Sequence, residues 1–198
     1  MHNSSVTETE EILKGIQLIL CDVDGVLTDS TKVYDTSGIV VYKTFSDLDT
    51  LGFRLAERMR KTYPQVPEVI LVSGDMRVNL RFAQVHGVSF VHTGYQSKIV
   101  PCKSLMEERD LEVGEVAFVG NDINDLECLR SFISFCPSDA LVPIQGVCDF
   151  VLNRPGGQGA FRELLDKIVF AKGFTLNDYL ECLPPYYEEG LGYEVSVG

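Results

Sequence analysis

Short apolar runs alternate with helical repeats along most of the chain. Residues 16–21 and 69–72 are apolar almost without interruption, which is typical of strands buried on both faces of a sheet. Residues 47–60 instead carry apolar side chains at every third or fourth position, the spacing of an amphipathic helix. By these criteria we expect strands at 16–21, 69–72, 90–92, 116–119, 133–135 and 150–152, helices at 47–60, 76–86, 98–109, 123–129 and 160–170, and a helix or turn at 140–147.

This alternation predicts an α/β fold with a doubly wound, mostly parallel sheet, in which ligands bind beyond the carboxyl ends of the strands. Residues 31–43 interrupt the pattern, because two short apolar segments flank Asp-Thr-Ser-Gly. We therefore expect a β-hairpin that projects from the main sheet. Residues 1–15 are predicted to be a flexible arm that can form a helix over 7–13, residues 16–176 the domain, and residues 177–198 a tail extending from a short helix.

Composition and charge exclude several classes of protein. The chain has 198 residues, 45% of them hydrophobic, and a formal net charge of −12, which disfavours a nucleic-acid surface. No apolar run approaches the roughly 20 residues needed to span a bilayer, and the start of the chain is unlike a secretory signal. We therefore expect a soluble, cytoplasmic protein whose six scattered cysteines are reduced. An anionic substrate would need a few well-placed cations and a metal.

Polar clusters follow several of the predicted strands. Asp22 and Asp24 come directly after the first strand, and residues 73–75, Lys98 and residues 120–125 lie beside later ones. Side chains two apart on an extended chain point the same way, so the two aspartates can approach one ligand. Each cluster alone has an ordinary explanation, as a turn, a loop, a solvated lysine or a capped helix. Their ordered occurrence at strand ends favours a common site.

The residue types suit phosphoryl transfer. One carboxylate can attack phosphorus and a second can handle the proton of the leaving group. A hydroxyl and an ammonium group can hold the phosphoryl oxygens. Acidic and amide oxygens are suitable ligands for Mg²⁺.

The motifs Asp22-x-Asp24-Gly-Val-x-Thr-Asp, Ser73-Gly, Lys98 and Gly120-Asn-Asp-x-x-Asp resemble those of the haloacid dehalogenase superfamily. Within it, the chain is similar to the small-cap (C0) branch of 3-deoxy-D-manno-octulosonate 8-phosphate phosphatases. That branch includes acylneuraminate 9-phosphate phosphatases and a phosphatase-like domain fused to some acylneuraminate cytidylyltransferases. The resemblance covers residues 16–168, including the hairpin and the segments 45–52, 94–98 and 156–163.

The resemblance implies a Rossmann-like core without a large cap domain, and roles for individual residues. Asp22 would be the nucleophile that forms an aspartyl-phosphate, and Asp24 the general acid, which would also offer its backbone carbonyl to Mg²⁺. Ser73 and Lys98 would bind the transferring phosphoryl group. The implied substrate-binding residues are Ser73, Gly74, Lys98, Asp49 and Arg77, and the implied metal-site residues are Asp22, Asp24, Asn121, Asp122 and Asp125.

Three positions depart from the family pattern. Asn121 replaces the usual metal-ligand aspartate, so either its amide oxygen or Asp122 would serve the metal. Asp75 and Gln158 replace arginines, which weakens the case for an octulosonate substrate. Candidate cations for a sugar-acid carboxylate are Lys43, Arg54, Arg77 and Arg162, although each type of side chain is more often a plain surface charge.

The leading hypothesis is a Mg²⁺-dependent phosphatase acting on a phosphorylated 2-keto-3-deoxy sugar acid. The resemblance also implies a homotetramer in which the hairpins close neighbouring sites, while a local flap on its own subunit is the alternative. A catalytically weak phosphatase-like module for oligomerisation or regulation is the second functional hypothesis. A phospho-accepting receiver domain is the third, disfavoured because the Asp-x-Asp follows the first strand.

Overall fold

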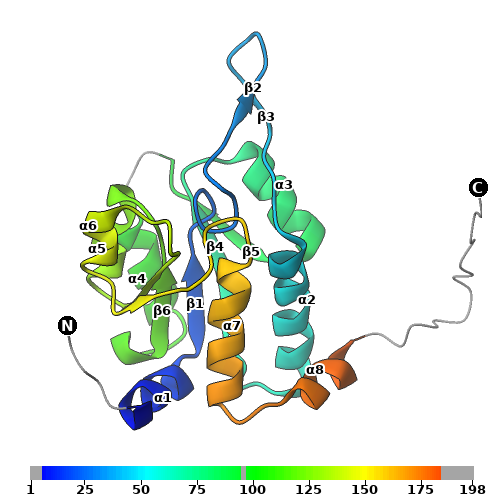
Figure 1. Ribbon diagram of the computed structural model, residues 1–198, viewed down its shortest axis with the longest axis vertical. Coiled ribbons are helices and arrows are strands. Elements are labelled where there is room, and N and C mark those ends of the chain that lie inside the picture. The colour runs from blue at the N-terminus through cyan, green and yellow to red at the C-terminus, as the bar shows by residue number, and fades with distance from the viewer. Residues whose placement is uncertain (1–5, 95–96, 184–198) are drawn as a thin grey trace, which may run out of the picture.

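A parallel sheet of six strands forms the centre of the molecule (Figure 1). The computed structural model describes residues 6–94 and 97–183. All neighbouring strands of this sheet run parallel, so the predicted doubly wound α/β fold is confirmed. In spatial order the strands are β5 (Ser89–His92), β4 (Glu68–Ser73), β1 (Leu18–Cys21), β6 (Val116–Val119), β7 (Ile133–Cys136) and β8 (Phe150–Val151).

Helices cover both faces of the sheet, because each strand of its centre is apolar on both sides. In β1, Ile19 and Cys21 join one buried cluster while Leu18 and Leu20 join the other, as expected for side chains that alternate across a strand. The first cluster is covered by α1 (Val6–Gly15), α2 (Asp47–Thr62), α3 (Arg77–His86), α7 (Ala160–Ala171) and α8 (Leu176–Cys182). The second is covered by α4 (Ile99–Glu107), α5 (Leu126–Leu129) and α6 (Val142–Gln145), with 3₁₀ turns at Val113–Glu115 and Ile123–Asp125.

Helix α2 shows how local signals and packing agree. The Ser46 side chain accepts a hydrogen bond from the backbone N–H of Leu48 and so caps the first turn. On the buried face, the ring of Phe53 stacks on Phe161 of α7 with centroids 4.1 Å apart. Burying a side chain of this size contributes about 2 kcal/mol, so this contact fixes α2 against α7.

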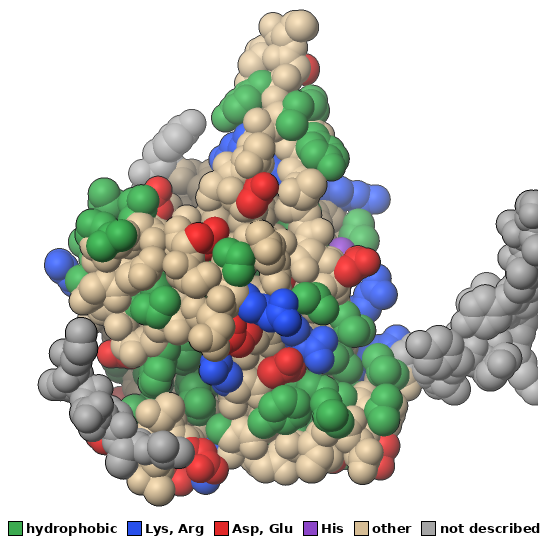
Figure 2. Space-filling view, in the orientation of Figure 1, with side chains coloured by type: hydrophobic (Ala, Val, Ile, Leu, Met, Phe, Trp, Pro, Cys, Tyr) green, Lys and Arg blue, Asp and Glu red, His purple; other side chains and the backbone are tan. Residues whose placement is uncertain are grey.

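The expected hairpin projects away from the main sheet as a second, two-stranded sheet (Figure 1). Its strands are β2 (Val33–Tyr34) and β3 (Val40–Tyr42), which pair antiparallel. Hydrophobic side chains flank its stalk (Figure 2), and their exposed fractions run from 45% to 58% for Val33, Tyr34, Val41 and Tyr42. An exposed apolar surface of this kind commonly marks an interaction site.

Both ends of the described chain pack on the domain. Leu13 of α1, within the expected N-terminal arm, is buried against the core that α7 shares. Tyr179 of α8, within the expected tail, is buried as well, and its hydroxyl donates to Asp166. The remaining parts of the two segments, residues 1–5 and 184–198, lie outside the described residues. None of the described helices is long and apolar enough to cross a membrane.

Candidate active site

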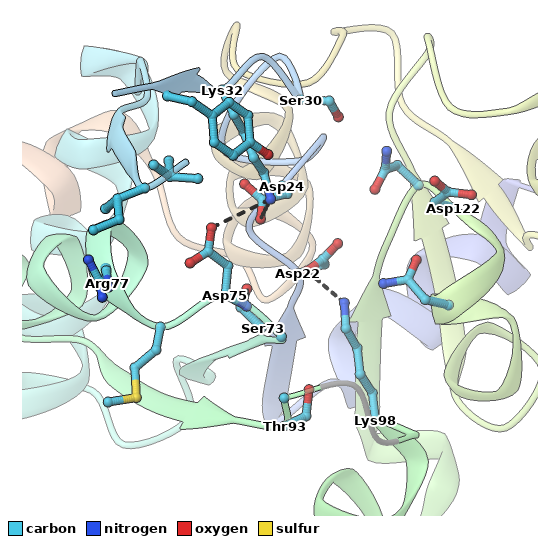
Figure 3. A pocket seen from close by; sticks show the side chains of 18 of the residues that line it. Asp22, Asp24, Ser30, Lys32, Ser73, Asp75, Arg77, Thr93, Lys98 and Asp122 are labelled. Carbon is cyan, nitrogen blue, oxygen red and sulfur yellow. Dashed lines mark hydrogen bonds and ion pairs between the residues drawn. The ribbon is translucent and has the colours of Figure 1, made fainter. Parts of the chain in front are cut away.

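The carboxyl ends of β1, β4 and β6 open into a cavity of about 850 Å³ (Figure 3). Because these three strands are neighbours in the sheet, polar residues that follow them in sequence meet at one edge. The hairpin of the same subunit supplies one wall through Tyr34, Ile39 and Val40. The cavity is lined by most of the residues singled out from the sequence, namely Asp22, Asp24, Ser73, Gly74, Arg77, Lys98, Asn121 and Asp122.

At the floor of the cavity, Lys98 lies between two buried carboxylates. Its Nζ is 2.6 Å from Asp22 Oδ1 and 2.7 Å from Asp125 Oδ1, and all three side chains are at most 5% exposed. Burial, and after it the charge of Asp125, raise the pKa of Asp22 above its usual range. Burial opposes the charged form of Lys98, but the two carboxylates together raise its pKa. Lys98 thus holds Asp22 at the cavity while neutralising part of the surrounding charge.

Asp125, expected to support the metal site, is fully buried beside Lys98 and is absent from the cavity lining. Its Oδ2 accepts hydrogen bonds from the backbone N–H groups of Asn121 at 3.0 Å and Asp122 at 3.3 Å. The carboxylate folds over Gly120, where an added Cβ would lie 2.6 Å from Asp125 Cγ. Asp125 has therefore committed both oxygens to the lysine and the turn.

Asn121 and Asp122 both line the cavity, and their side-chain oxygens differ in their hydrogen-bond partners. The buried Oδ1 of Asn121 has no hydrogen-bond partner among the described residues. Asp122 uses its Oδ1 to accept the backbone N–H of Ile123 at 2.6 Å. The Asn121 amide packs against Gly25, which has φ +91° and where an added Cβ would lie 2.0 Å from Nδ2. Gly25 is needed here for both the backbone conformation and the close approach.

Two lysines bind Asp24 at the other side of the cavity. Lys43, whose side chain is completely buried, donates to Asp24 Oδ1 and Asp75 Oδ2 at 2.7 Å each. Lys32 lies 3.3 Å from Asp24 Oδ2 and 3.5 Å from Asp75 Oδ2. Burial raises the pKa of Asp75, but the hydrogen bond and the charge of Lys43 lower it, and the net effect is a lowered pKa. The negative charge of Asp75, one of the departures from the family pattern, is therefore neutralised by two lysines of the hairpin segment.

Asn79 was not singled out from the sequence; it is a fully buried residue of α3 that connects the two halves of the site. Its Nδ2 donates to Ser73 Oγ at 2.9 Å, and its Oδ1 accepts from Lys43 Nζ at 2.9 Å. The available signal was an amide on the buried face of an amphipathic helix, where an apolar side chain is usual.

Asp49, expected in the substrate-binding set, is not among the residues that line the cavity. It is completely buried and accepts the backbone N–H groups of Gly159 at 3.2 Å and Arg162 at 2.9 Å, which caps α7. Burial raises its pKa to about 6, against the lowering effect of these two hydrogen bonds. The turn before α7 packs on the loop that follows Asp22 and Asp24 (residues 22–29, here called the catalytic loop), where the N–H of Gly157 donates to the carbonyl oxygen of Val26 at 3.0 Å.

The four candidate cations separate by position. Arg77 lines the cavity, and Lys43 is held by Asp24 and Asp75 behind it. Arg54 is not among the cavity-lining residues. Arg162 pairs with Asp166 at 2.7 Å instead. Gln158, at the other departure from the family pattern, is also absent from the lining.

Known proteins are similar to this chain in sequence and in fold. No family model matches the chain. It is 30% identical, over 83% of its length and 88% of the relative, to 3-deoxy-D-manno-octulosonate 8-phosphate phosphatase of Haemophilus influenzae. The cobalt-bound structure of that phosphatase from Haemophilus influenzae is 32% identical and superposes with a TM-score of 0.75, covering 85% of this chain and 99% of the other.

A second kind of relative matches in part. N-acylneuraminate cytidylyltransferase of Oncorhynchus mykiss is 29% identical over 79% of this chain, but only 36% of that enzyme is covered. The phosphatase match covers 83% of this chain and 88% of the relative, and Asp22, Ser73 and Lys98 lie together at the cavity. The chain therefore belongs to the 3-deoxy-D-manno-octulosonate 8-phosphate phosphatase family of the haloacid dehalogenase superfamily, and it is a phosphoric monoester hydrolase.

Proposed function

We propose that the protein is a Mg²⁺-dependent phosphatase that hydrolyses the phosphomonoester of a 2-keto-3-deoxy sugar acid through an aspartyl-phosphate. The substrate class is an octulosonate 8-phosphate or a nonulosonate 9-phosphate. The observation that carries this proposal is the placement of Asp22 at the cavity with Lys98 only 2.6 Å from its carboxylate. A carboxylate beside a fixed cation is suited to attack phosphorus, because the cation offsets charge on the phosphoryl oxygens.

The proposed reaction has two steps, in which Asp22 and Asp24 have different roles. In the first, an oxygen of Asp22 forms a bond to phosphorus, the bond to the sugar oxygen breaks, and Asp24 gives its proton to that oxygen. In the second, Asp24 takes a proton from water, the water oxygen bonds to phosphorus, and the bond to Asp22 breaks to release inorganic phosphate. Ser73 and Lys98 hold the phosphoryl oxygens throughout.

The residues present fit a divalent cation. Asn121 Oδ1 is a buried acceptor that no described donor satisfies, and such an atom is costly unless it is paired. Asp22, the backbone carbonyl of Asp24 and Asn121 would hold Mg²⁺, whose bound charge would stabilise the phosphoryl group. Within the described residues, no group of three or more His, Cys, Asp or Glu side chains is spaced for a metal. The proposed ligand set combines a carboxylate with an amide and a backbone oxygen.

The acidic sugar is proposed from the family and from the cavity. The relatives in the family are named for a phosphorylated sugar acid. Arg77 lines the cavity and offers positive charge for the carboxylate of such a substrate. A charge-assisted hydrogen bond of this kind would orient the sugar relative to Asp22.

The proposal is tested by measuring phosphate release from octulosonate 8-phosphate, acylneuraminate 9-phosphates and hexose phosphates, with and without Mg²⁺. Replacing Asp22 by Asn is expected to abolish Mg²⁺-dependent release. The matched control is Asp29→Asn, an exposed aspartate of the same loop, which should retain activity. Undiminished release by the Asp22→Asn variant would refute the nucleophile, and a strong preference for hexose phosphates would overturn the substrate class.

A second candidate function is a catalytically weak, phosphatase-like module that serves oligomerisation or regulation. Two observations favour it: the neutral Asn121 at the metal position and the similarity to part of a cytidylyltransferase. Its test is the Asn121→Asp variant. A large gain in phosphate release over a nearly inactive wild type supports the module, whereas an active wild type rules it out.

The proposed assembly is a homotetramer built around the hairpins. The exposed apolar side chains of β2 and β3 are the observation that supports it. Light scattering of the wild type and of a Val33→Lys/Val41→Lys variant tests it. A tetramer that the double substitution dissociates supports the assembly, and a wild-type monomer supports the local flap, whose tip already lines the cavity of its own subunit.

A further inference from the structure

We propose that Asn79 is a positioning residue that sets the direction of the Ser73 hydroxyl, so that Ser73 donates its proton to a phosphoryl oxygen. This inference rests on the proposed function, in which Ser73 holds the transferring group. It adds a buried amide of α3 that does not itself line the cavity.

The neighbours of Asn79 determine which way its amide points. Lys43 Nζ lies 2.9 Å from Oδ1 of Asn79, and an ammonium group can only donate hydrogen bonds. The oxygen of the amide therefore faces Lys43, and the Nδ2 group faces the opposite side. There it donates to Ser73 Oγ at 2.9 Å and lies 3.4 Å from Asp24 Oδ2.

The Ser73 hydroxyl accepts two hydrogen bonds, and only its proton is left to form another. Its oxygen accepts from Asn79 Nδ2 and from the backbone N–H of Asp75 at 3.2 Å. A hydroxyl oxygen has two lone pairs, so both are occupied and only the proton remains. Ser73 donates this proton to none of the described residues, and its side chain lines the cavity. The proton is thus available to a ligand oxygen, with little reorganisation when the phosphoryl group arrives.

The burial of Asn79 agrees with this role. Asn79 lies in the first turn of α3, and a buried amide is costly unless its polar atoms are paired. Every side-chain hydrogen bond of Asn79 ends on a residue of the site, namely Ser73, Asp24 or Lys43. An apolar residue on this face of α3 would pack without these requirements, so the amide contributes to the site more than to the fold.

A double-mutant cycle separates positioning from structural support. The variants are Asn79→Ala, Ser73→Ala and the pair, assayed for Mg²⁺-dependent hydrolysis of a simple aryl phosphate. Ser73→Ala is expected to lower kcat/KM about 100-fold, as loss of a transition-state donor does. Asn79→Ala is expected to lower it about tenfold in the wild-type background, mostly through kcat, but less than about twofold when Ser73 is already alanine.

A charge-changing variant gives a second readout. In Asn79→Asp, the new carboxylate accepts the proton of Ser73, so the loss should approach that of Ser73→Ala, about 100-fold. Gln84→Glu is the matched control, because it makes the same amide-to-carboxylate change on an exposed position of α3. Urea unfolding of each variant shows that the measured protein is folded.

The same double-mutant cycle can be measured without catalysis, as the affinity of each variant for inorganic phosphate in the presence of Mg²⁺, determined by calorimetry. Equal losses for Asn79→Ala in both backgrounds, in folded proteins, would overturn the positioning role while leaving the phosphatase intact. A wild type that neither hydrolyses a phosphomonoester nor binds phosphate would overturn the proposed function together with this inference. Coupled losses in either measurement support it.

Discussion

Asp49 offers a sharp test of how burial controls charge in this protein. Its carboxylate is completely buried beneath α7, and its two partners are the backbone N–H groups of Gly159 and Arg162. Replacing it by Asn keeps the size and one acceptor oxygen but removes the ability to ionise. The pH dependence of stability should therefore differ between the wild type and the Asp49→Asn variant.

The magnitude follows from the pKa of about 6 in the folded protein against the ordinary value of 3.8. A factor of ten in proton affinity is worth about 1.4 kcal/mol, so the difference corresponds to about 3 kcal/mol. The folded state binds this proton more tightly than the unfolded chain does. Ionisation of Asp49 consequently lowers the free energy of unfolding as pH rises from about 4 to about 6, and the loss is complete above that range.

Urea unfolding at several pH values between 4 and 7.5 measures this effect as a difference between the two proteins. The free energy of unfolding of the wild type, relative to Asp49→Asn, should fall by up to about 3 kcal/mol between the ends of this range, or about 6–12 °C in Tm for a domain of this size. Asp47→Asn, two residues away and exposed, should follow the wild type. Parallel curves for the wild type and Asp49→Asn would refute the reasoning.

Two further predictions concern the floor of the site and the catalytic loop. Lys98→Met leaves the buried carboxylates of Asp22 and Asp125 without a cation. The free energy of unfolding should therefore fall by about 3–5 kcal/mol, and the rate of phosphate release should fall by at least about 100-fold. Lys103→Met, on the exposed side of α4, should change neither quantity. Gly25→Ala should cost more stability and activity than Gly38→Ala, because both glycines have positive φ but only Gly25 faces the Asn121 amide. Equal losses in the two glycine variants would contradict the crowding argument.

The site also shows how an acidic chain can attract an anionic substrate. The whole protein carries a formal charge of −12, yet Lys32, Lys43 and Lys98 converge on the carboxylates of the cavity. They come from the hairpin segment and from the start of α4, which are distant in sequence. Because charge interactions are strong over short distances and screened over long ones, these placed lysines matter more to a bound phosphate than the net charge does.

Much of the fold could be predicted because its signals are local. The strand expected at 116–119 is β6, and the helix expected at 76–86 is α3, which ends where Gly87 adopts a left-handed conformation. Buried parallel strands are continuously apolar and such helix ends favour glycine, so both can be read from neighbouring residues. The helix expected at 123–129 is instead a 3₁₀ turn followed by α5, because Asp122 and Asp125 bind the backbone of the turn.

The sequence by itself determined the order of strands and helices and the motifs that meet at the strand ends, including Asp22, Ser73 and Lys98. Only the tertiary structure decided how individual polar side chains are used. Asp49 caps α7, Asp125 holds Lys98, and Asn79 binds Ser73 and Lys43. The physical reason is that periodicity and turn preferences act over a few neighbouring residues, whereas the partner of a buried polar group is chosen by whichever donor or acceptor the packed fold brings within about 3 Å.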